Sequence, residues 1–255
     1  MHVIDAAVLG IVEGLTEFLP VSSTGHLILA SKILGLPESG FWQSFEIIIQ
    51  LGAIAAIALL YFKKFFDPTI LKKIIIGSIP TAVIGFLLYP IVKKYFLGTE
   101  TIVVWALLIG GVLMIACERL FRNRASEESG VREISNAQAF LIGIFQSIAI
   151  IPGVSRSAAT IIGGLALGIP RTAIVEFSFL LAVPAIAGAA GLDLVSSGLS
   201  MSRNEVLLLV VGFVTAFVVA LMSIKIFLRF VKTNDFTPFG IYRIAIALIF
   251  LLFIL

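Results

Sequence analysis

The sequence predicts an all-α polytopic membrane protein made of two inverted-topology repeats, each a re-entrant helical hairpin followed by three transmembrane helices. Three observations lead to this prediction. Hydrophobic residues make up 60% of the chain and charged residues 13%, six apolar runs approach the ~20 residues that span a bilayer, and the chain contains an internal repeat. A soluble domain of 255 residues does not need so much apolar surface.

The repeat relates residues 10–37 to residues 143–170 without a gap. Eight of the 28 paired positions are identical, where a chain this apolar should give roughly two or three by chance. Each copy carries a polar loop, at 20–26 in the first and 152–157 in the second. A lipid-facing helix would carry neither hydroxyls nor charge there, so we expect the function to lie in these two loops.

The apolar stretches around the two loops do not resemble simple spans, because each is interrupted by proline and hydroxyl residues. Irregular backbone at membrane depth is tolerated only where it is buried in protein or lines a wet cavity, so we predict re-entrant hairpins. The first repeat, 1–121, then comprises a hairpin at about 3–36 and spans at about 42–62, 74–92 and 101–121. After a polar cytoplasmic linker at 122–135, the second repeat, 136–255, comprises a hairpin at about 137–170 and spans at about 172–193, 205–229 and 238–255.

Loop charges predict the orientation. Lysine and arginine are concentrated after the first, third and fifth spans, at Lys63, Lys64, Lys72, Lys73, Arg119, Arg122, Arg124, Arg132, Lys225, Arg229 and Lys232. The positive-inside rule places these loops in the cytoplasm and both termini on the far side. Three spans per repeat is an odd number, so the second copy is inverted and the two hairpins can meet near the midplane. Aromatic residues at span ends, Tyr61 and Tyr242 among them, are typical of interfacial anchors.

Composition also bears on partners. The basic residues form no stripe, and there is no soluble domain to carry one, so we expect no nucleic-acid partner. Cys117 stands alone in an apolar run, which predicts a buried, inert thiol. Glu13 and Glu17 inside the first apolar run argue against a cleavable signal peptide. Gly110-Gly111 and Gly163-Gly164 would allow close helix packing and, with it, a homodimer.

The first hairpin carries two acidic residues. Glu13 and Glu17 lie four residues apart and share one helix face. A carboxylate at the bilayer centre costs about 3 kcal/mol, so the pair indicates a wet cavity, a cation or proton transfer. Two alternatives remain. Both residues could lie inertly near the interface, or Glu13, whose repeat partner is Gln146, could form only a structural hydrogen bond.

The loop after these acids predicts a phosphate site. Pro20 ends the first arm, and Ser22 or Ser23 can cap the next helix, whose free N–H groups suit phosphate. Ser22 and Thr24 are therefore candidate substrate-binding hydroxyls. A lone histidine in a core is usually structural, but His26 stands three residues after Ser23 and near two carboxylates, which favours a chemical role.

The second hairpin repeats this arrangement with an arginine. Pro152-Gly153 makes the turn, and Ser155-Arg156-Ser157 opens the next helix. An intramembrane guanidinium is costly unless it is paired, and its planar fork matches two phosphate oxygens. Arg156 therefore predicts an anion clamp. Structural pairing with Glu13 or Glu17 is the alternative, and the two interpretations are compatible.

Together the loops supply a nucleophile (Ser23 or His26), a base (Glu17), an anion clamp (Arg156) and hydroxyl donors. That set is sufficient for phosphoryl transfer, in which positioning and charge stabilisation provide most of the rate. The competing hypothesis is a transporter or flippase of an anionic prenyl lipid or small ion, because inverted repeats with broken helices are a transporter architecture. A flippase would need only the arginine and the hydroxyls.

At these residues the chain resembles the undecaprenyl-diphosphatase family, also called the bacitracin-resistance family, of bacterial inner membranes. Its first signature is similar to Glu13-Gly-Leu-Thr-Glu17-Phe-Leu-Pro-Val-Ser-Ser-Thr-Gly-His26, and its second to Pro152-Gly-Val-Ser-Arg-Ser157 followed by Thr160. The similarity extends over nearly the whole chain and includes Phe177-Ser178-Phe179-Leu180-Leu181 with Pro184.

The resemblance implies a phosphatase that removes the terminal phosphate of undecaprenyl diphosphate and yields the monophosphate carrier for cell-wall synthesis. It also implies a divalent cation, Mg²⁺ or Ca²⁺, and a plasma-membrane location. Our hypothesis, supported by the loop charges, is that the site faces the extracytoplasmic side. By the same matching, Glu13 and Glu17 belong to the acidic, metal-binding motif, Ser23 and His26 to the catalytic group, and Arg156 to diphosphate binding. Supporting donors would be Ser22, Ser155, Ser157 and Thr160.

Overall fold

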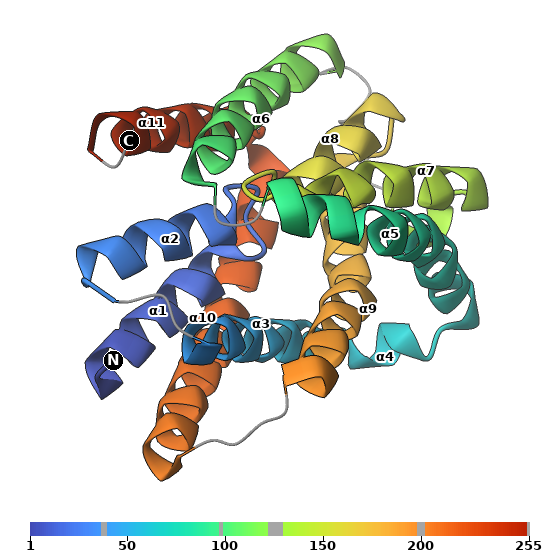
Figure 1. Cartoon of the computed structure of the whole chain (residues 1–255). Coiled ribbons are helices and arrows are strands. Elements are labelled where there is room, and N and C mark those ends of the chain that lie inside the picture. Colours follow the sequence, from blue (N-terminus) through green and yellow to red (C-terminus); the bar gives the residue numbers. More distant parts are fainter. Residues whose placement is uncertain (37–39, 97–98, 122–129, 198–201, 254–255) are drawn as a thin grey trace.

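The computed structural model describes residues 1–36, 40–96, 99–121, 130–197 and 202–253, and all regular structure in these ranges is helical (Figure 1). The hairpin helices are α1 (Val3–Thr16), α2 (Ser23–Ile33), α7 (Asn136–Ser147), η2 (Ile148–Ile150) and α8 (Arg156–Ala166). The remaining helices are α3 (Gly40–Leu60), α4 (Phe62–Phe65), α5 (Pro68–Tyr95), α6 (Glu100–Phe121), η1 (Val131–Glu133), α9 (Arg171–Ser197), α10 (Arg203–Thr233) and α11 (Thr237–Phe253). Of the predicted linker, residues 122–129, with Arg122 and Arg124, lie outside the described ranges.

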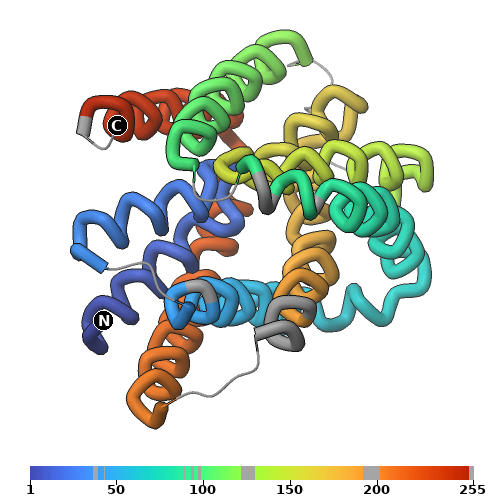
Figure 2. Tube along the Cα trace, in the orientation of Figure 1, coloured from blue at the N-terminus to red at the C-terminus, as the bar shows by residue number. Residues whose placement is uncertain are grey.

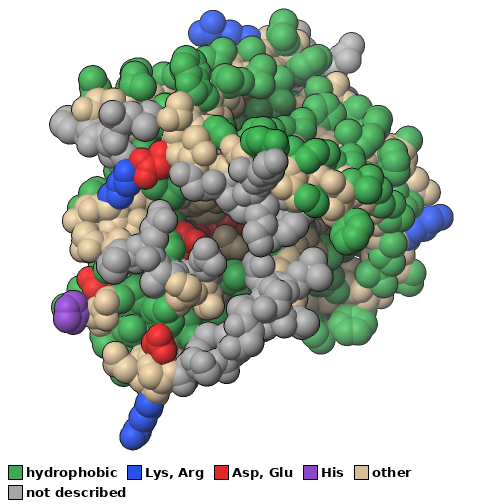
Figure 3. Space-filling model, in the orientation of Figure 1, with side chains coloured by type: hydrophobic (Ala, Val, Ile, Leu, Met, Phe, Trp, Pro, Cys, Tyr) green, Lys and Arg blue, Asp and Glu red, His purple; other side chains and the backbone are tan. Residues whose placement is uncertain are grey.

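The long helices are those of a membrane protein. By length and composition, α3, α5, α6, α9 and α10 can each cross a bilayer. The sixth predicted span corresponds to α11, which has 17 described residues. Large apolar side chains lie on the outer surface, where Phe86 is 80% and Leu87 65% exposed, and hydrophobic atoms cover much of the face in Figure 3. Water-soluble proteins rarely expose such patches, so a multi-pass, all-α membrane protein is confirmed.

Several helices extend beyond the predicted spans. α5 begins at Pro68 rather than at about 74, because the Asp67 carboxylate accepts hydrogen bonds from the N–H groups of Thr69 (3.0 Å) and Ile70 (3.3 Å). α10 continues to Thr233, past the predicted end at 229. Hydropathy detects only the part of a helix that lies in hydrocarbon, whereas the helix itself continues until a cap or a break ends it.

Each predicted hairpin is a pair of short helices that contact each other, α1 with α2 and α7 with α8. Both α2 and α8 have 11 residues, a length of about 16 Å at 1.5 Å per residue. A hydrocarbon core of about 30 Å is too thick for a helix of that length to cross. In each hairpin the chain therefore turns back on itself between two short helices, and the prediction that the hairpins re-enter the membrane stays a prediction.

The two turns have the same unusual backbone at equivalent positions of the repeat. Ser22 precedes α2 with φ +73°, and Ser155 precedes α8 with φ +67°. These are the non-glycine residues with positive φ in the part of the chain that the structure describes. Each serine hydroxyl caps its helix by accepting a hydrogen bond, from the N–H of Gly25 (3.4 Å) and of Ala158 (3.3 Å) respectively. Such conformations cost about 1–3 kcal/mol and concentrate at functional sites.

Gly10 and Gly143, which occupy equivalent positions in the repeat, each lie where two helices cross closely. Gly10 on α1 faces α10, where an added Cβ would lie 2.7 Å from the carbonyl oxygen of Gly212. Gly143 on α7 faces α5, and an added Cβ there would meet the carbonyl oxygen of Gly77. Figures 1 and 2 show α1 beside α10 and α7 beside α5. The first helix of each hairpin, α1 or α7, thus packs against the second long helix of the other repeat, α10 or α5 respectively.

Gly110-Gly111 and Gly163-Gly164, the pairs that would allow a homodimer, pack against other helices of the same chain. An added Cβ at Gly111 would lie 2.7 Å from the carbonyl oxygen of Gly240 on α11, and one at Gly110 would meet the guanidinium of Arg243. Gly163 and Gly164 likewise pack against side chains of α7 and α9. These glycines offer no free face to a second copy, and the homodimer stays a prediction. Cys117 is half-buried rather than buried.

A buried ion pair ties three helices together at the end of the molecule that carries the linker. The Glu118 carboxylate, on a residue only 3% exposed, accepts hydrogen bonds from Arg171 Nε (3.0 Å) and Nη2 (2.5 Å). It also accepts one from the backbone N–H of Phe236 (3.1 Å). Glu118 therefore links α6 to the start of α9 and to the α10–α11 turn.

Replacing Glu118 with glutamine should destabilise the fold by about 3 kcal/mol, because the partly buried Arg171 would lose the carboxylate that it contacts with two N–H groups. The measurement is the thermal unfolding midpoint of purified protein in detergent. The matched control is Glu100→Gln, which breaks the Lys32–Glu100 pair, whose side chains are 42% and 28% exposed; we expect a change under ~1 kcal/mol there. Equal midpoints for the two variants would contradict this assignment.

Candidate active site

The turns of the two hairpins meet near the middle of the molecule (Figure 2). The Ser157 hydroxyl at the start of α8 donates a hydrogen bond to the carbonyl oxygen of Leu19 in the other turn (2.8 Å). Arg156 Nη2 lies 3.2 Å from Glu17 Oε1. Residues predicted from loops more than 130 positions apart in the sequence are therefore neighbours. In Figure 3 a hollow near the centre of the visible face has acidic side chains at its floor.

Glu17 is the centre of this cluster. Its Oε2 accepts a hydrogen bond from Ser23 Oγ at 2.6 Å, and its Oε1 accepts one from Arg156. Both Glu17 and Ser23 are buried. The geometry arises because α1 ends at Thr16, the chain turns through Pro20, and α2 starts again at Ser23. A carboxylate in direct contact with a serine hydroxyl is placed to remove its proton.

Arg156 is held from two sides. Its Nη1 donates to the backbone carbonyl of Ser178 on α9 (2.7 Å), and its Nη2 donates to Glu17. The structural pairing considered from the sequence is therefore present. The Nε of Arg156 is buried with no hydrogen-bond partner in the described structure, and the side chain is 11% exposed. An unsatisfied buried donor on a positioned guanidinium suits an incoming phosphate oxygen.

His26 contacts Tyr242 and not Ser23. Its Nδ1 lies 2.7 Å from the carbonyl oxygen of Ser22, and its Nε2 lies 2.7 Å from the hydroxyl of Tyr242. A carbonyl only accepts, so Nδ1 carries the proton and Nε2 accepts from Tyr242. The two rings stack with centroids 5.5 Å apart. Tyr242, predicted only as an interfacial anchor, thus belongs to the site.

Glu13 is the unsatisfied member of the cluster. It is fully buried, and neither carboxylate oxygen has a hydrogen-bond partner in the described structure. Glu17, Glu46 and the positively charged Arg156 lie close enough to interact with it electrostatically. Its repeat partner Gln146 instead donates to the hydroxyl of Thr81 (2.9 Å). Orphaned carboxylate oxygens are the ligands that Mg²⁺ and Ca²⁺ prefer, so these residues fit a divalent cation, although the described residues contain no cluster of three or more His, Cys, Asp or Glu placed to hold one.

The remaining predicted hydroxyls lie around this cluster. The Ser155 and Ser157 hydroxyls lie 3.1 Å apart, and Ser22 and Ser155 serve as helix caps. Thr160 Oγ1 donates to Ser178 Oγ (2.7 Å) and so lies beside the carbonyl that holds Arg156. Thr24 is half-buried in the first turn of α2. All predicted site residues therefore lie in the two hairpin loops or near the N-terminal ends of α2 and α8. The exception is Glu13, which lies near the C-terminal end of α1.

Arg243 on α11 is a further site residue that the sequence interpretation missed. It is completely buried, and its guanidinium donates to the carbonyls of Pro20 (3.3 Å) and Gly153 (3.2 Å), one in each hairpin turn. Further bonds go to the carbonyls of Ala106 (2.9 Å) and Leu107 (3.4 Å) on α6. The signal was available, because an arginine inside an apolar span is costly and usually functional.

Comparison with known proteins agrees with this arrangement. The family model described as bacitracin resistance protein BacA matches residues 6–249. The chain belongs to the BacA family. Among curated members, proteins named undecaprenyl-diphosphatase are 50% identical over 256 residues in Persephonella marina, covering 100% of both chains, and 47% identical over 252 residues in Sulfurihydrogenibium sp. strain YO3AOP1, covering 99% of both. The Aquifex aeolicus member, with the same name, is 48% identical over 252 residues and 98% of both chains.

Proposed function

We propose that this BacA-family protein is an integral-membrane phosphatase that hydrolyses undecaprenyl diphosphate to undecaprenyl phosphate and inorganic phosphate. This reaction recycles the lipid carrier for cell-wall synthesis and confers bacitracin resistance. The observation that carries the proposal is Glu17, which contacts both Ser23 (2.6 Å) and Arg156 (3.2 Å) across the two hairpins. A nucleophile, a base and an anion clamp in one buried cluster are the parts that phosphoryl transfer requires.

The contacts favour Ser23 as the nucleophile. Glu17 takes the proton of Ser23 as Oγ attacks the terminal phosphorus, and the bond from phosphorus to the bridging oxygen breaks. Glu17 then passes the proton to the departing undecaprenyl phosphate. Water, deprotonated by Glu17, then attacks the phosphoserine. The bond from phosphorus to Oγ breaks, Glu17 gives the proton to Oγ, and inorganic phosphate leaves. Arg156 stabilises the charge on the phosphoryl oxygens throughout.

We propose that Glu13, with Glu17, would hold the divalent cation, Mg²⁺ or Ca²⁺, that the family resemblance implies. Bound there, the cation would neutralise charge on the diphosphate. The support is the pair of buried, unpartnered Glu13 oxygens. Glu17 already accepts two hydrogen bonds. Glu13 therefore has more carboxylate lone pairs available to bind a cation.

We further propose two inverted repeats in a bacterial plasma membrane, with the site open to the extracytoplasmic side. Support for the repeats comes from the matched turns at Ser22 and Ser155. Support for the orientation comes from the basic residues at one end of the molecule. There Lys64 pairs with Glu176, Lys73 donates to the carbonyl oxygen of Val131, and Arg171 pairs with Glu118. A cation-rich end is expected to remain in the cytoplasm.

The enzyme and the flippase are separated by one assay, inorganic phosphate release from undecaprenyl diphosphate by protein purified in detergent. No membrane remains there to transport across, so turnover requires chemistry. We expect phosphate release that depends on added Mg²⁺ or Ca²⁺ and is lost on chelation. Folded protein that releases no phosphate under any cation would contradict the phosphatase and favour the transporter.

Substituting the nucleophile and the base should separate their roles. Ser23→Ala is expected to abolish the phosphoenzyme, and Glu17→Gln to lower kcat by about 10²–10⁴-fold, the usual contribution of a positioned base. Denaturing the wild type during turnover of radiolabelled substrate should leave an acid-stable phosphoserine. An acid-labile phosphohistidine would reassign the nucleophile to His26, and the absence of both would indicate direct attack by water.

A further inference from the structure

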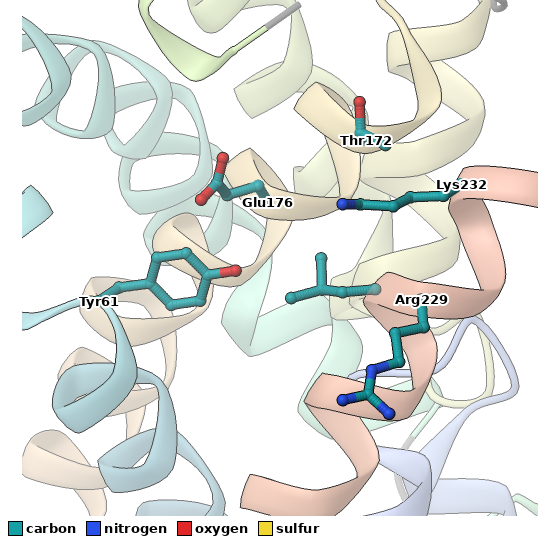
Figure 4. Close-up of a pocket in the computed structure, with 6 residues that line it drawn as sticks. Tyr61, Thr172, Glu176, Arg229 and Lys232 are labelled. Carbon is teal, nitrogen blue, oxygen red and sulfur yellow. The ribbon is translucent and has the colours of Figure 1, made fainter. Parts of the chain in front are cut away.

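A cavity lined by both apolar and charged side chains lies at the end of the molecule where α3 finishes, α9 begins and α10 ends. It has a volume of about 280 Å³ and is lined by Tyr61, Thr172, Glu176, Leu228, Arg229 and Lys232 (Figure 4). A water molecule takes about 30 Å³ in the liquid, so the cavity has room for a group much larger than water. None of its lining residues belongs to either hairpin turn, and the proposed phosphatase mechanism uses none of them.

The charges around this cavity favour an anion. Glu176 is neutralised by an ion pair with Lys64 from α4. Arg229 and Lys232, three residues apart on the last turns of α10, form no ion pair in the described structure. Figure 4 shows the ammonium of Lys232 and the hydroxyl of Tyr61 directed into the cavity from opposite sides. A positive charge and a hydroxyl donor on opposite sides of the cavity suit the oxygens of a phosphate group. Arg229, which is exposed and whose guanidinium points away from Lys232 in Figure 4, adds a second positive charge at the same end of α10.

The surroundings favour a phosphate carried by a lipid. Tyr61 directly follows the membrane-crossing helix α3, so the cavity lies at the level where such helices leave the bilayer. The neighbouring side chains of Leu59, Phe62 and Phe66 are 60%, 61% and 71% exposed. Apolar side chains this exposed at a helix end offer a surface on which acyl chains can lie. Basic pockets between membrane helices are a known form of anionic-lipid site.

We propose that this cavity binds the phosphate headgroup of an anionic phospholipid, separately from the substrate site. Arg229 and Lys232 would hold the phosphate oxygens, and Tyr61 would donate a hydrogen bond. A lipid bound there would join the end of α10 to α3 and α9, and so raise the stability of this end of the molecule. The proposal does not depend on the phosphatase activity, since its measurement is lipid binding.

The experiment uses the full-length protein, purified and freed of lipid in detergent. Phosphatidylglycerol, phosphatidylcholine or inorganic phosphate is added at equal phosphate concentration, and the thermal midpoint is recorded together with bound lipid by native mass spectrometry. We expect phosphatidylglycerol to raise the midpoint by about 3 °C or more and to remain bound. Phosphatidylcholine and inorganic phosphate should each produce less than half of this shift.

The variant is Arg229→Gln with Lys232→Gln, and the matched control is Lys63→Gln with Lys72→Gln. Both control lysines are exposed at the same end of the molecule and line no part of the cavity. The control should keep the phosphatidylglycerol shift and the pocket variant should lose it. Each single pocket substitution should weaken the apparent affinity about fivefold, which keeps the test decisive if the double variant does not fold.

Three results would overturn the proposal. The pocket variant could keep the full shift and the bound lipid. Phosphatidylcholine could match phosphatidylglycerol, in which case headgroup charge plays no part. Inorganic phosphate could match the lipid, which would make the cavity a site for a free anion.

Discussion

Replacing Arg156 with alanine is expected to reduce phosphate release by about 10²–10³-fold or more, because a positioned donor to the transition-state charge is lost. The protein should still insert and fold, with a lower unfolding midpoint because the buried Glu17 loses its counter-charge. Arg156 Nη1 is bound to a carbonyl of α9 and Nη2 to Glu17, while its buried Nε has no partner in the described structure. The side chain is thus fixed with a donor still free for the substrate.

Arg156→Lys separates charge from geometry. An ammonium keeps the positive charge but cannot form the planar fork, so we expect a loss of at least about tenfold in kcat. The measurements are kcat and KM for phosphate release, with the unfolding midpoint as the check on folding. Arg203→Ala, an exposed arginine at the start of α10, is the control and should behave like the wild type. Unchanged turnover in Arg156→Ala would remove the clamp assignment.

Replacing Arg243 with alanine is expected both to destabilise the protein and to abolish activity. The guanidinium donates to four backbone carbonyls, including Pro20 and Gly153 in the two hairpin turns. Each buried carbonyl left without a partner costs about 1–3 kcal/mol. Because Arg243 touches both turns, we infer that it is a positioning residue that holds Ser23 and Arg156 at the correct separation.

Arg243→Lys distinguishes positioning from stability. An ammonium retains the charge but has three donors on one atom and cannot serve all four carbonyls. We expect a folded protein whose kcat falls at least about tenfold with little change in KM, because the substrate contacts of Arg156 remain. A purely structural role would lower the midpoint and leave kcat of the folded fraction unaltered.

A double-mutant cycle with Gly110 adds a second check on Arg243. An added Cβ at Gly110 would meet the Arg243 guanidinium, so Gly110→Ala should destabilise the wild type. The same substitution should cost less when residue 243 is alanine, since the space is then free. Additive effects of the two substitutions would show that the guanidinium does not occupy this space.

Local sequence patterns were sufficient for much of the fold. Hydropathy identified the long helices because each must present a continuous apolar surface to lipid. The gap-free repeat located the two polar loops, and the structure has helices of equal length at equivalent positions after them, Ser23–Ile33 and Arg156–Ala166. Helix ends were less predictable, because the Asp67 cap and the polar last turns of α10 lie outside the apolar runs.

The composition of the site was predictable where residues break the apolar pattern. Glu13, Glu17, Ser23, His26 and Arg156 are all costly in a membrane-facing helix, so each indicated a special environment. Their pairing was not predictable. Whether Glu17 contacts Ser23, and whether His26 contacts Ser23 or an aromatic residue, depends on the angles at which separate helices cross.

By itself, the sequence determined the membrane class, the repeat and the chemical groups available at the two turns, since these follow from the cost of placing each side chain in hydrocarbon. Tertiary structure alone decided which groups meet. It brought Arg243 from α11 onto the turns and Tyr242 onto His26, because glycines let α11 approach α6 closely. Within the described residues it left the carboxylate of Glu13 buried without a hydrogen-bond partner. Contacts between segments far apart in the chain depend on how helices pack, and no local pattern contains that information.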